Sequence, residues 1–409
     1  MQNNEDKFFR QVLPNGLTVI FEKREIPTVS IIAATRFGSG HEDEKIKGLA
    51  HLLEHTVFKR TKTKTGEQLT SLIEKKGGQI NAYTSEEVTA FWTKLKAENF
   101  EVGMDVLADM MMNPSLNKKD LDVEKKVILE EIRNNHDIME KYVLTKLFQQ
   151  LYASPFGLPI LGTPQTIKAI TRPTINKYHG VFYSPSSMVI SVVGKADVDK
   201  IWNFSRKYFM RKQVQKQIDK KMKVTVAPGP FGSVVEKRNG IDQAHIAIGY
   251  QMPSLKDPLR YAAEIMNIIL GVGQSSKLFQ QIREKKGFAF DVYSNLNQGL
   301  NQGDGYIYMG AEKSKHAQAL KLAIAELKNM QSIGPEEVEQ AKEQLIGLYT
   351  IESENTDKVA QQLLDEQLAG DAKTYYQYPE KIKAVTTEQV RKVAELAASK
   401  IATVVVLPE

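Results

Sequence analysis

The sequence contains no cysteine among its 409 residues. This absence excludes disulfide bonds, thiolate zinc sites and cysteine nucleophiles, so any metal ion must be held by histidines and carboxylates. Long apolar runs are also absent, since no stretch approaches the roughly 20 consecutive apolar residues that a membrane-spanning helix needs. We therefore expect no membrane partner.

The N-terminal residues MQNNEDKFFRQ lack the apolar stretch of a secretory signal and contain the acidic residues that transit peptides avoid. As written, the sequence predicts a cytoplasmic protein. The net charge is +6, but the basic residues are dispersed and interrupted by acidic ones. This pattern does not favour a nucleic-acid partner.

The length predicts about two domains, because single cores stop growing near roughly 250 to 300 residues. An internal repeat points the same way. The alternating run from Thr28 to Ile32 resembles that from Gln243 to Ala247, and Ile170-Thr171 resembles Val385-Thr386, both at an offset of 215 residues. Two separate places that share one offset indicate a duplication.

Each half of the repeat is expected to hold strands, then helices, then a terminal strand. We predict the fold class α+β, with two homologous α/β-sandwich domains, each an antiparallel sheet packed with helices. The predicted domains are residues 1–211 and 231–409. The lysine-rich segment 212–230, which includes Ala-Pro-Gly-Pro, is the predicted linker.

A candidate metal motif lies in the first domain, where residues 48–58 are predicted to form a helix. The apolar residues of this segment recur at helical spacing: Leu49, Leu52, Leu53 and Val57. His51 and His55 are one turn apart on the same face, so their imidazoles can bind one ion, and Glu54 lies beside them. A lone histidine on a helix is more often a packing residue, so this motif needs a third ligand.

The repeat provides an internal control for this motif. The positions 215 residues after His51, Glu54 and His55 are all apolar: Met266, Ile269 and Leu270. Packing of this helix does not require histidines, so the polar residues of the first copy are extra to the fold.

A second helical stretch, residues 120–133, offers candidates for the third ligand. Glu124 and Glu131 lie seven residues apart and therefore share one face of the helix. The alternative is a solvated acidic face with lysine partners. Glu130, about 100° around the helix from Glu131, fits that alternative.

The H-x-x-E-H motif, 75 intervening residues, and a glutamate within a Glu-x6-Glu helix together resemble the inverted-zincin metallopeptidases, the family of pitrilysin, insulin-degrading enzyme and mitochondrial processing peptidase. The chain is similar to the short, two-domain bacterial or archaeal members. The resemblance covers nearly the whole chain through further segments: Leu13-Pro14-Asn15-Gly16-Leu17, Gly38-Ser39-Gly40, residues 77–84, Gly157 to Gly162, Tyr183-Ser184-Pro185, Val192-Val193-Gly194, Ser275 to Phe279 and Arg283 to Gly287.

The resemblance implies one zinc ion per chain, bound in the first domain by His51, His55 and Glu131. A fourth position on zinc would hold a water molecule, whose proton Glu54 would accept as general base during attack on a peptide carbonyl. The resemblance also suggests that Glu124 orients a histidine ligand as a supporting catalytic residue.

Residues 79–95 alternate in polarity and predict a hairpin that turns near Ser85 and Glu86. A free edge beside the zinc would let an extended peptide substrate add as a strand. The resemblance places Asn81 and Ala82 at this edge.

Family members carry an Arg and, seven residues later, a Tyr that help to hold the substrate and stabilise the oxyanion. Arg283 is present, but Phe290 stands at the second position and has no hydroxyl to donate. Tyr293, three residues on, is expected on the opposite face of its strand. Two chains of short members close like a clamshell, so we expect a homodimer, or a heterodimer with a homologous chain that carries the complete Arg/Tyr pair.

Three functions remain open from the sequence. The leading one is a zinc-dependent endopeptidase that hydrolyses peptides or unfolded segments inside a closed chamber. The alternative is a weakly active or non-catalytic subunit of a heterodimeric peptidase or assembly, which Phe290 mildly favours. A zinc hydrolase of another bond is the third, and the predicted edge strand disfavours it.

Overall fold

The computed structural model describes residues 7–210, 224 and 226–409. Most of the predicted linker, including residues 212–223, therefore lies outside the described residues. The chain forms two compact units, each assembled from three segments. Unit 1 comprises Met1–Ile132, Pro159–Thr225 and Ile351–Gln377, and unit 2 comprises Arg133–Leu158, Val226–Thr350 and Tyr378–Glu409.

In the described part of unit 1, six strands form one sheet in the order β1-β2-β6-β3-β5-β4. The strands are β1 (Phe8–Val12), β2 (Thr18–Lys23), β3 (Thr28–Thr35), β4 (Gln79–Thr84), β5 (Thr89–Lys96) and β6 (Met188–Gly194). Only the β2–β6 pair is parallel, and β4 lies at one edge of the sheet. The central strands β3 and β6 are almost entirely buried, because helices cover both faces of the sheet.

The helices of unit 1 are α1 (Leu49–Lys59), α2 (Gly66–Glu74), α3 (Phe100–Met112), α4 (Lys118–Asp137, of which the part up to Ile132 belongs to this unit), α6 (Pro164–Ala169), α7 (Arg172–Phe182), α8 (Val198–Phe209) and α12 (Thr356–Ala369). Apolar residues of α1, α3 and α8 join those of one sheet face in a single core. This arrangement fixes the candidate metal helix α1 against the sheet.

In the described part of unit 2, five strands form a sheet in the order β7-β11-β8-β10-β9. They are β7 (Ser233–Arg238), β8 (Ala244–Gln251), β9 (Ala289–Gln298), β10 (Gly303–Ala311) and β11 (Ile401–Pro408). Its helices are α5 (Met139–Leu151), α9 (Arg260–Gly271), α10 (His316–Asn329), α11 (Pro335–Glu352, up to Thr350), α13 (Tyr378–Ala384) and α14 (Thr387–Ser399). Here the one parallel pair is β7–β11.

The two units share one plan, as the repeat predicts. In each, the terminal strand, β6 or β11, lies between a parallel and an antiparallel neighbour. The predicted α+β fold class with two homologous domains is confirmed. The sheets differ from the prediction in being mixed rather than purely antiparallel, because β6 pairs in parallel with β2 and β11 pairs in parallel with β7.

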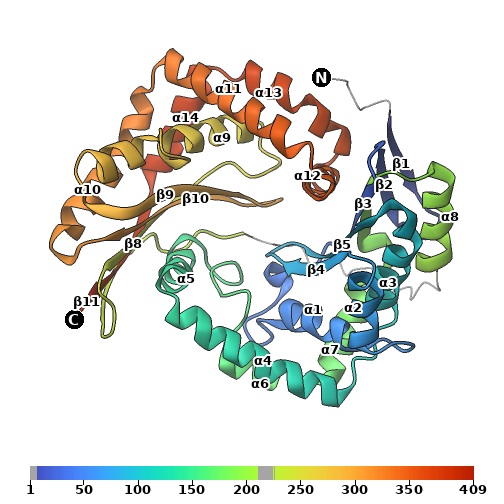
Figure 1. The fold of residues 1–409 in the computed structure, drawn as a ribbon. Coiled ribbons are helices and arrows are strands. Elements are labelled where there is room, and N and C mark those ends of the chain that lie inside the picture. Colours follow the sequence, from blue (N-terminus) through green and yellow to red (C-terminus); the bar gives the residue numbers. More distant parts are fainter. Residues whose placement is uncertain (1–6, 211–223, 225) are drawn as a thin grey trace. The chain divides into compact units, whose positions relative to one another are not determined.

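The units differ from the predicted continuous domains, because each half of the chain gives one helix to the other unit. Helix α12 packs on β3 and β6 of unit 1, and α5 packs on β8 and β11 of unit 2 (Figure 1). The apolar stripe of α5 (Met139, Val143, Leu147 and Leu151) is buried there. Gly249 of β8 permits the close approach, since a Cβ at this position would lie 2.9 Å from a Leu151 methyl carbon. The sequence pattern predicts such a stripe but not the sheet that covers it.

No helix in the described part of the chain combines the length and apolar character needed to cross a bilayer.

Candidate metal centre

Helix α1 carries the H-x-x-E-H motif and is held firmly at its N-terminus. Gly48 precedes the helix with φ +95°, a left-handed conformation that glycine adopts without a Cβ clash. The buried carboxylate of Glu42 accepts hydrogen bonds from the backbone N–H groups of Gly48 and Ala50. This cap satisfies donors that the first turn leaves without partners, and the negative charge suits the positive end of the helix dipole.

Three side chains converge beside α1. The Nε2 atoms of His51 and His55 each lie 3.8 Å from Oε2 of Glu131 on α4. Two atoms that bind one zinc ion at about 2.0 to 2.1 Å can be at most about 4.2 Å apart, so both distances fit a shared ion. Among the described residues, His51, His55 and Glu131 are the one group of three that offers ligand atoms all within 4.8 Å of one another.

Glu124, which also lies on α4, fixes the orientation of one of the two histidines. Oε2 of Glu124 lies 3.0 Å from Nδ1 of His55, and its other oxygen lies 2.8 Å from Nζ of Lys59. A hydrogen bond from Nδ1–H of His55 to this carboxylate leaves the lone pair of Nε2 directed toward Glu131. This contact supports the orienting role that the resemblance suggests for Glu124.

The electrostatics of these groups suit a bound cation. Burial lowers the pKa of His51 to about 4, so its ring is neutral near pH 7. Burial by itself would lower the pKa of His55. The carboxylates of Glu124, Glu54 and Glu131 together outweigh this effect, so the pKa of His55 is raised. Two imidazole nitrogens and one carboxylate make a donor set typical of a zinc site that keeps a fourth position open. The residues present thus fit the metal that the sequence analysis predicted.

Glu54, the predicted general base, is buried on the same helix, and burial raises the pKa of its carboxyl. Its Oε2 accepts a hydrogen bond from the hydroxyl of Thr84, the last residue of β4. Glu54 is not one of the three candidate ligands, so its carboxylate is not needed to hold the ion and is free for the proton transfer predicted for it.

The predicted substrate strand is β4. It lies at one edge of the sheet, and among the described residues it pairs with no strand except β5; it packs against α1. Asn81 is exposed and Ala82 is half-buried on this edge, and the side-chain oxygen of Asn81 accepts the N–H of Ala82 at 2.8 Å. The free edge of β4 can therefore offer main-chain groups to an extended peptide.

The turn of the β4–β5 hairpin is tied to the segment before α1. The N–H groups of Ser39 and Gly40 donate to the carbonyls of Ser85 and Glu86, at 3.0 and 2.6 Å. A Cβ at Gly38 would lie 2.3 Å from the carbonyl oxygen of Ser85, so only glycine allows this approach. These contacts fix the edge strand relative to the metal helix.

Arg283 and Phe290, the predicted substrate-binding pair, lie together in unit 2. The Arg283 guanidinium carbon is 5.1 Å from the centre of the Phe290 ring and 4.7 Å from that of Phe279. Phe290 is 68% exposed at the start of β9. The arrangement is a cation–π stack that leaves a large apolar ring in solvent.

Tyr293, expected on the strand face opposite to Phe290, follows an irregularity in β9. Ala311 of β10 pairs with Ala289 and Gly310 pairs with Asp291, so Phe290 is an extra residue in a β-bulge. Ala289 and Val292 lie three residues apart and are both buried in the core of unit 2, as a bulge between them allows. The Tyr293 hydroxyl donates a hydrogen bond to Glu140 at 2.5 Å.

Sequence reasoning missed three residues of this site: Glu42, Lys59 and Thr84. Lys59 could have been found, since it lies one turn after His55 on the same helix. Glu42 and Thr84 reach α1 from loops and strands, and no spacing rule predicts such contacts.

Two family models match the chain. Residues 18–164, which include the three candidate ligands and Glu54, match the model described as "Insulinase (Peptidase family M16)". Residues 169–345, which include Arg283 and Phe290, match the model described as "Peptidase M16 inactive domain".

Curated relatives extend over almost the full chain. A protein of Bacillus subtilis called "Uncharacterized zinc protease YmxG" is 31% identical over 398 residues, 94% of each chain. One of Mycobacterium leprae, "Uncharacterized zinc protease ML0855", is 29% identical and covers 96% of this chain and 89% of its own.

Solved structures agree in fold. A protease from Helicobacter pylori superposes with a TM-score of 0.91 at 23% identity, covering 98% of this chain and 100% of the other. A peptidase M16 inactive domain from Pseudomonas fluorescens has a TM-score of 0.88 at 19% identity, covering 98% of each chain. With these two-domain matches, the chain belongs to peptidase family M16, the pitrilysin type.

Proposed function

We propose that this chain is a zinc-dependent endopeptidase that cleaves peptides or unfolded polypeptide segments. The observation that carries the proposal is the convergence of His51, His55 and Glu131 beside the buried carboxylate of Glu54. The zinc protease names of the relatives support it.

In this proposal His51, His55 and Glu131 hold one zinc ion per chain, and Glu124 orients His55. When bound, zinc supplies Lewis-acid chemistry that activates water and polarises a peptide carbonyl. Glu54 accepts the proton of the attacking water and later delivers it to the leaving amine. Thr84 holds one oxygen of Glu54, so the other oxygen can point to the water.

The substrate is an extended segment that adds to the free edge of β4 near Asn81 and Ala82. Main-chain hydrogen bonds along an edge give affinity without demanding one side-chain sequence, so we propose broad specificity for unfolded segments. Folded proteins present few free strands of this kind and are excluded as substrates.

We propose further that the active assembly is a dimer that encloses the substrate in a clamshell chamber. A second copy of this chain would bring Arg283 with Phe290, whereas a homologous chain would bring an Arg/Tyr pair. The missing hydroxyl of Phe290 favours the heterodimer, since the loss of one oxyanion donor costs on the order of 10² to 10³ in rate.

A second candidate function follows from Phe290. A chain with Phe290 could serve as a weakly active or non-catalytic subunit of a peptidase or assembly. The intact donor set in unit 1 disfavours this candidate, because a purely structural subunit has no need of it.

The test is cleavage of a mixed pool of peptides of 10 to 30 residues by the purified chain, alone and with a candidate homologous partner. We expect cleavage that a chelator stops and zinc restores. Strong activity of the lone chain would contradict a heterodimer requirement. If both preparations bind zinc but neither cleaves, the non-catalytic candidate replaces the peptidase.

A further inference from the structure

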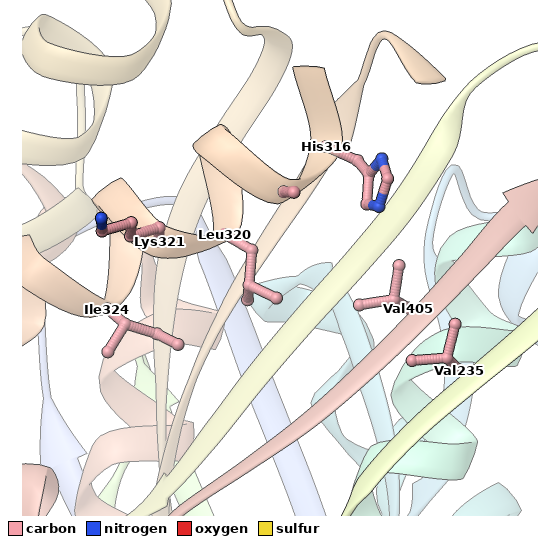
Figure 2. A pocket seen from close by; sticks show the side chains of 7 residues that line it. Val235, His316, Leu320, Lys321, Ile324 and Val405 are labelled. Atoms are coloured by element: carbon pink, nitrogen blue, oxygen red, sulfur yellow. The ribbon is translucent and has the colours of Figure 1, made fainter. Parts of the chain in front are cut away.

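Unit 2 has an apolar groove between helix α10 and the outer strands of its sheet. The groove has a volume of about 380 Å³. Leu320 and Ile324 line it from α10, Val235 from β7 and Val405 from β11, while His316 and Lys321 supply polar groups. Figure 2 shows Leu320 on the helix and Val405 and Val235 on two neighbouring strands.

The groove leaves an apolar residue of the sheet open to solvent. Val235 is 64% exposed, although its neighbour in the parallel register, Val405, is only 2% exposed. This difference shows that the cover on the helix side of the sheet extends over β11 but not over the edge strand β7.

The duplicated unit 1 offers a direct comparison. There β2 pairs in parallel with the terminal strand β6, as β7 pairs with β11. The core-facing residues of β2, Val19 and Phe21, are fully buried. Helix α8, which follows β6, packs on both β2 and α3.

Helices α3 and α10 occupy equivalent places, since each follows the corresponding strand after a short 3-10 turn, residues 97–99 or 313–315. In the described part of unit 2, no helix follows β11. The groove of α10, β7 and β11 is therefore the place that α8 fills in unit 1. Ile201, Ser205 and Phe209, at positions i, i+4 and i+8, are the buried face of α8.

The charges around the groove differ in sign from those of unit 1. In unit 1, Glu101 in the first turn of α3 pairs with Lys207 of α8 at 2.9 Å. In unit 2, His316 stands in the first turn of α10, and Lys321 and Lys237 are exposed beside the apolar residues. A helix that enters this groove would therefore meet basic groups and should carry acidic residues.

We propose that the groove of α10, β7 and β11 binds an amphipathic helix of a partner protein. This helix presents a face at i, i+4 and i+8 to the groove, with apolar residues at i and i+8 and a small residue at i+4 as in α8, and acidic residues beside them face Lys321, His316 and Lys237. The binding mode is that of a helix in an apolar groove.

A peptide probe tests the proposal on the full chain. The probe has the α8 sequence, Val198–Phe209, with the substitutions Lys200→Glu, Arg206→Glu and Lys207→Glu. A side-chain cross-link holds it helical, because a free helix of this length is marginal in water. Binding is measured by fluorescence anisotropy, with the unsubstituted α8 peptide as the charge control.

We expect saturable binding of the acidic probe and at least about tenfold weaker binding of the basic control. Val235→Gln and Lys321→Glu should each weaken binding of the acidic probe about tenfold, while Lys119→Glu, an equal charge change at an exposed site of α4, should leave it unchanged. Thermal unfolding checks that the variants fold.

Three results would overturn the proposal. The first is the absence of saturable binding by the folded chain. The second is binding that neither Val235→Gln nor Lys321→Glu weakens. The third is self-association of the chain that Val235→Gln abolishes, which would assign this groove to a second copy instead.

Discussion

Thr84, at the end of the edge strand β4, donates its hydroxyl hydrogen bond to the carboxylate of Glu54 on the metal helix α1. The strand proposed to bind substrate and the proposed general base are thus joined by one contact. The hairpin turn is also hydrogen-bonded to the segment before α1, so several contacts together fix the position of Thr84 relative to Glu54.

This contact predicts that Thr84→Val lowers kcat by about tenfold, because a hydrogen bond to a charged group contributes about 1.5 to 3 kcal/mol. KM should change little, since the side chain of Thr84 contacts Glu54 rather than the peptide. Thr84→Ser keeps the hydroxyl and should retain most of the activity. Full activity of Thr84→Val would show that the hydrogen bond does not matter.

Glu124→Gln is expected to weaken zinc binding by about 10- to 100-fold, the usual cost of losing a carboxylate that orients a metal-bound histidine. A competition titration with a chromophoric chelator measures this affinity. Asp122→Asn is the matched control, because Asp122 is exposed on the same helix and pairs only with Lys118 among the ion pairs of the described residues. If both variants bind zinc as the wild type does, Glu124 has no part in the metal site.

Phe290→Tyr should raise kcat/KM of the chain in a homodimer by up to about 10², because the new hydroxyl can stabilise the developing oxyanion. Stability should change by less than about 0.5 kcal/mol, since Phe290 is exposed. Steady-state kinetics on one cleaved peptide and urea unfolding measure the two effects. An unchanged rate in a folded, dimeric variant would mean that the ring at position 290 does not reach the reacting carbonyl.

The buried histidine of α7, His179, predicts that the protein becomes less stable as the pH falls. Burial lowers the pKa of His179 to about 4. The hydrogen bond from its Nε2–H to the carbonyl of Met111, at 2.8 Å, acts in the opposite direction but is the smaller effect. Between pH 6.5 and 4 the unfolded chain binds a proton that the folded chain does not, so the free energy of unfolding falls as the pH falls. In His179→Gln an amide replaces the ring and does not titrate, so urea midpoints at pH 7 and pH 5 should differ less than in the wild type. An equal acid-induced drop would exclude His179 as its source.

The sequence predicted the parts of the site that local geometry determines. His51 and His55 are one turn apart on a helix whose apolar face is plain in the pattern, and Glu131 shares a face with Glu124 two turns away. The contacts that required tertiary structure were not predictable. Thr84 lies 30 residues from Glu54 and reaches it only because the β4–β5 hairpin packs on α1.

Two further features of the fold escaped the sequence analysis, each for a clear physical reason. The exchange of α5 and α12 between units escaped prediction because an amphipathic stripe does not indicate which sheet it will cover. The bulge at Phe290, which shifts the register of β9 by one residue, also escaped prediction, because alternation assumes a regular strand.

The most direct test of the central claim compares the wild type with Glu54→Gln, in bound zinc and in peptide cleavage. Glu54 is not among the three candidate ligands, so the substitution should leave about one zinc per chain and reduce cleavage by at least about 10², the low end of a general base's contribution. Zinc bound by both proteins with cleavage lost only in the variant is the predicted result. A variant that cleaves as fast as the wild type, or a wild type that binds no zinc, would contradict the account.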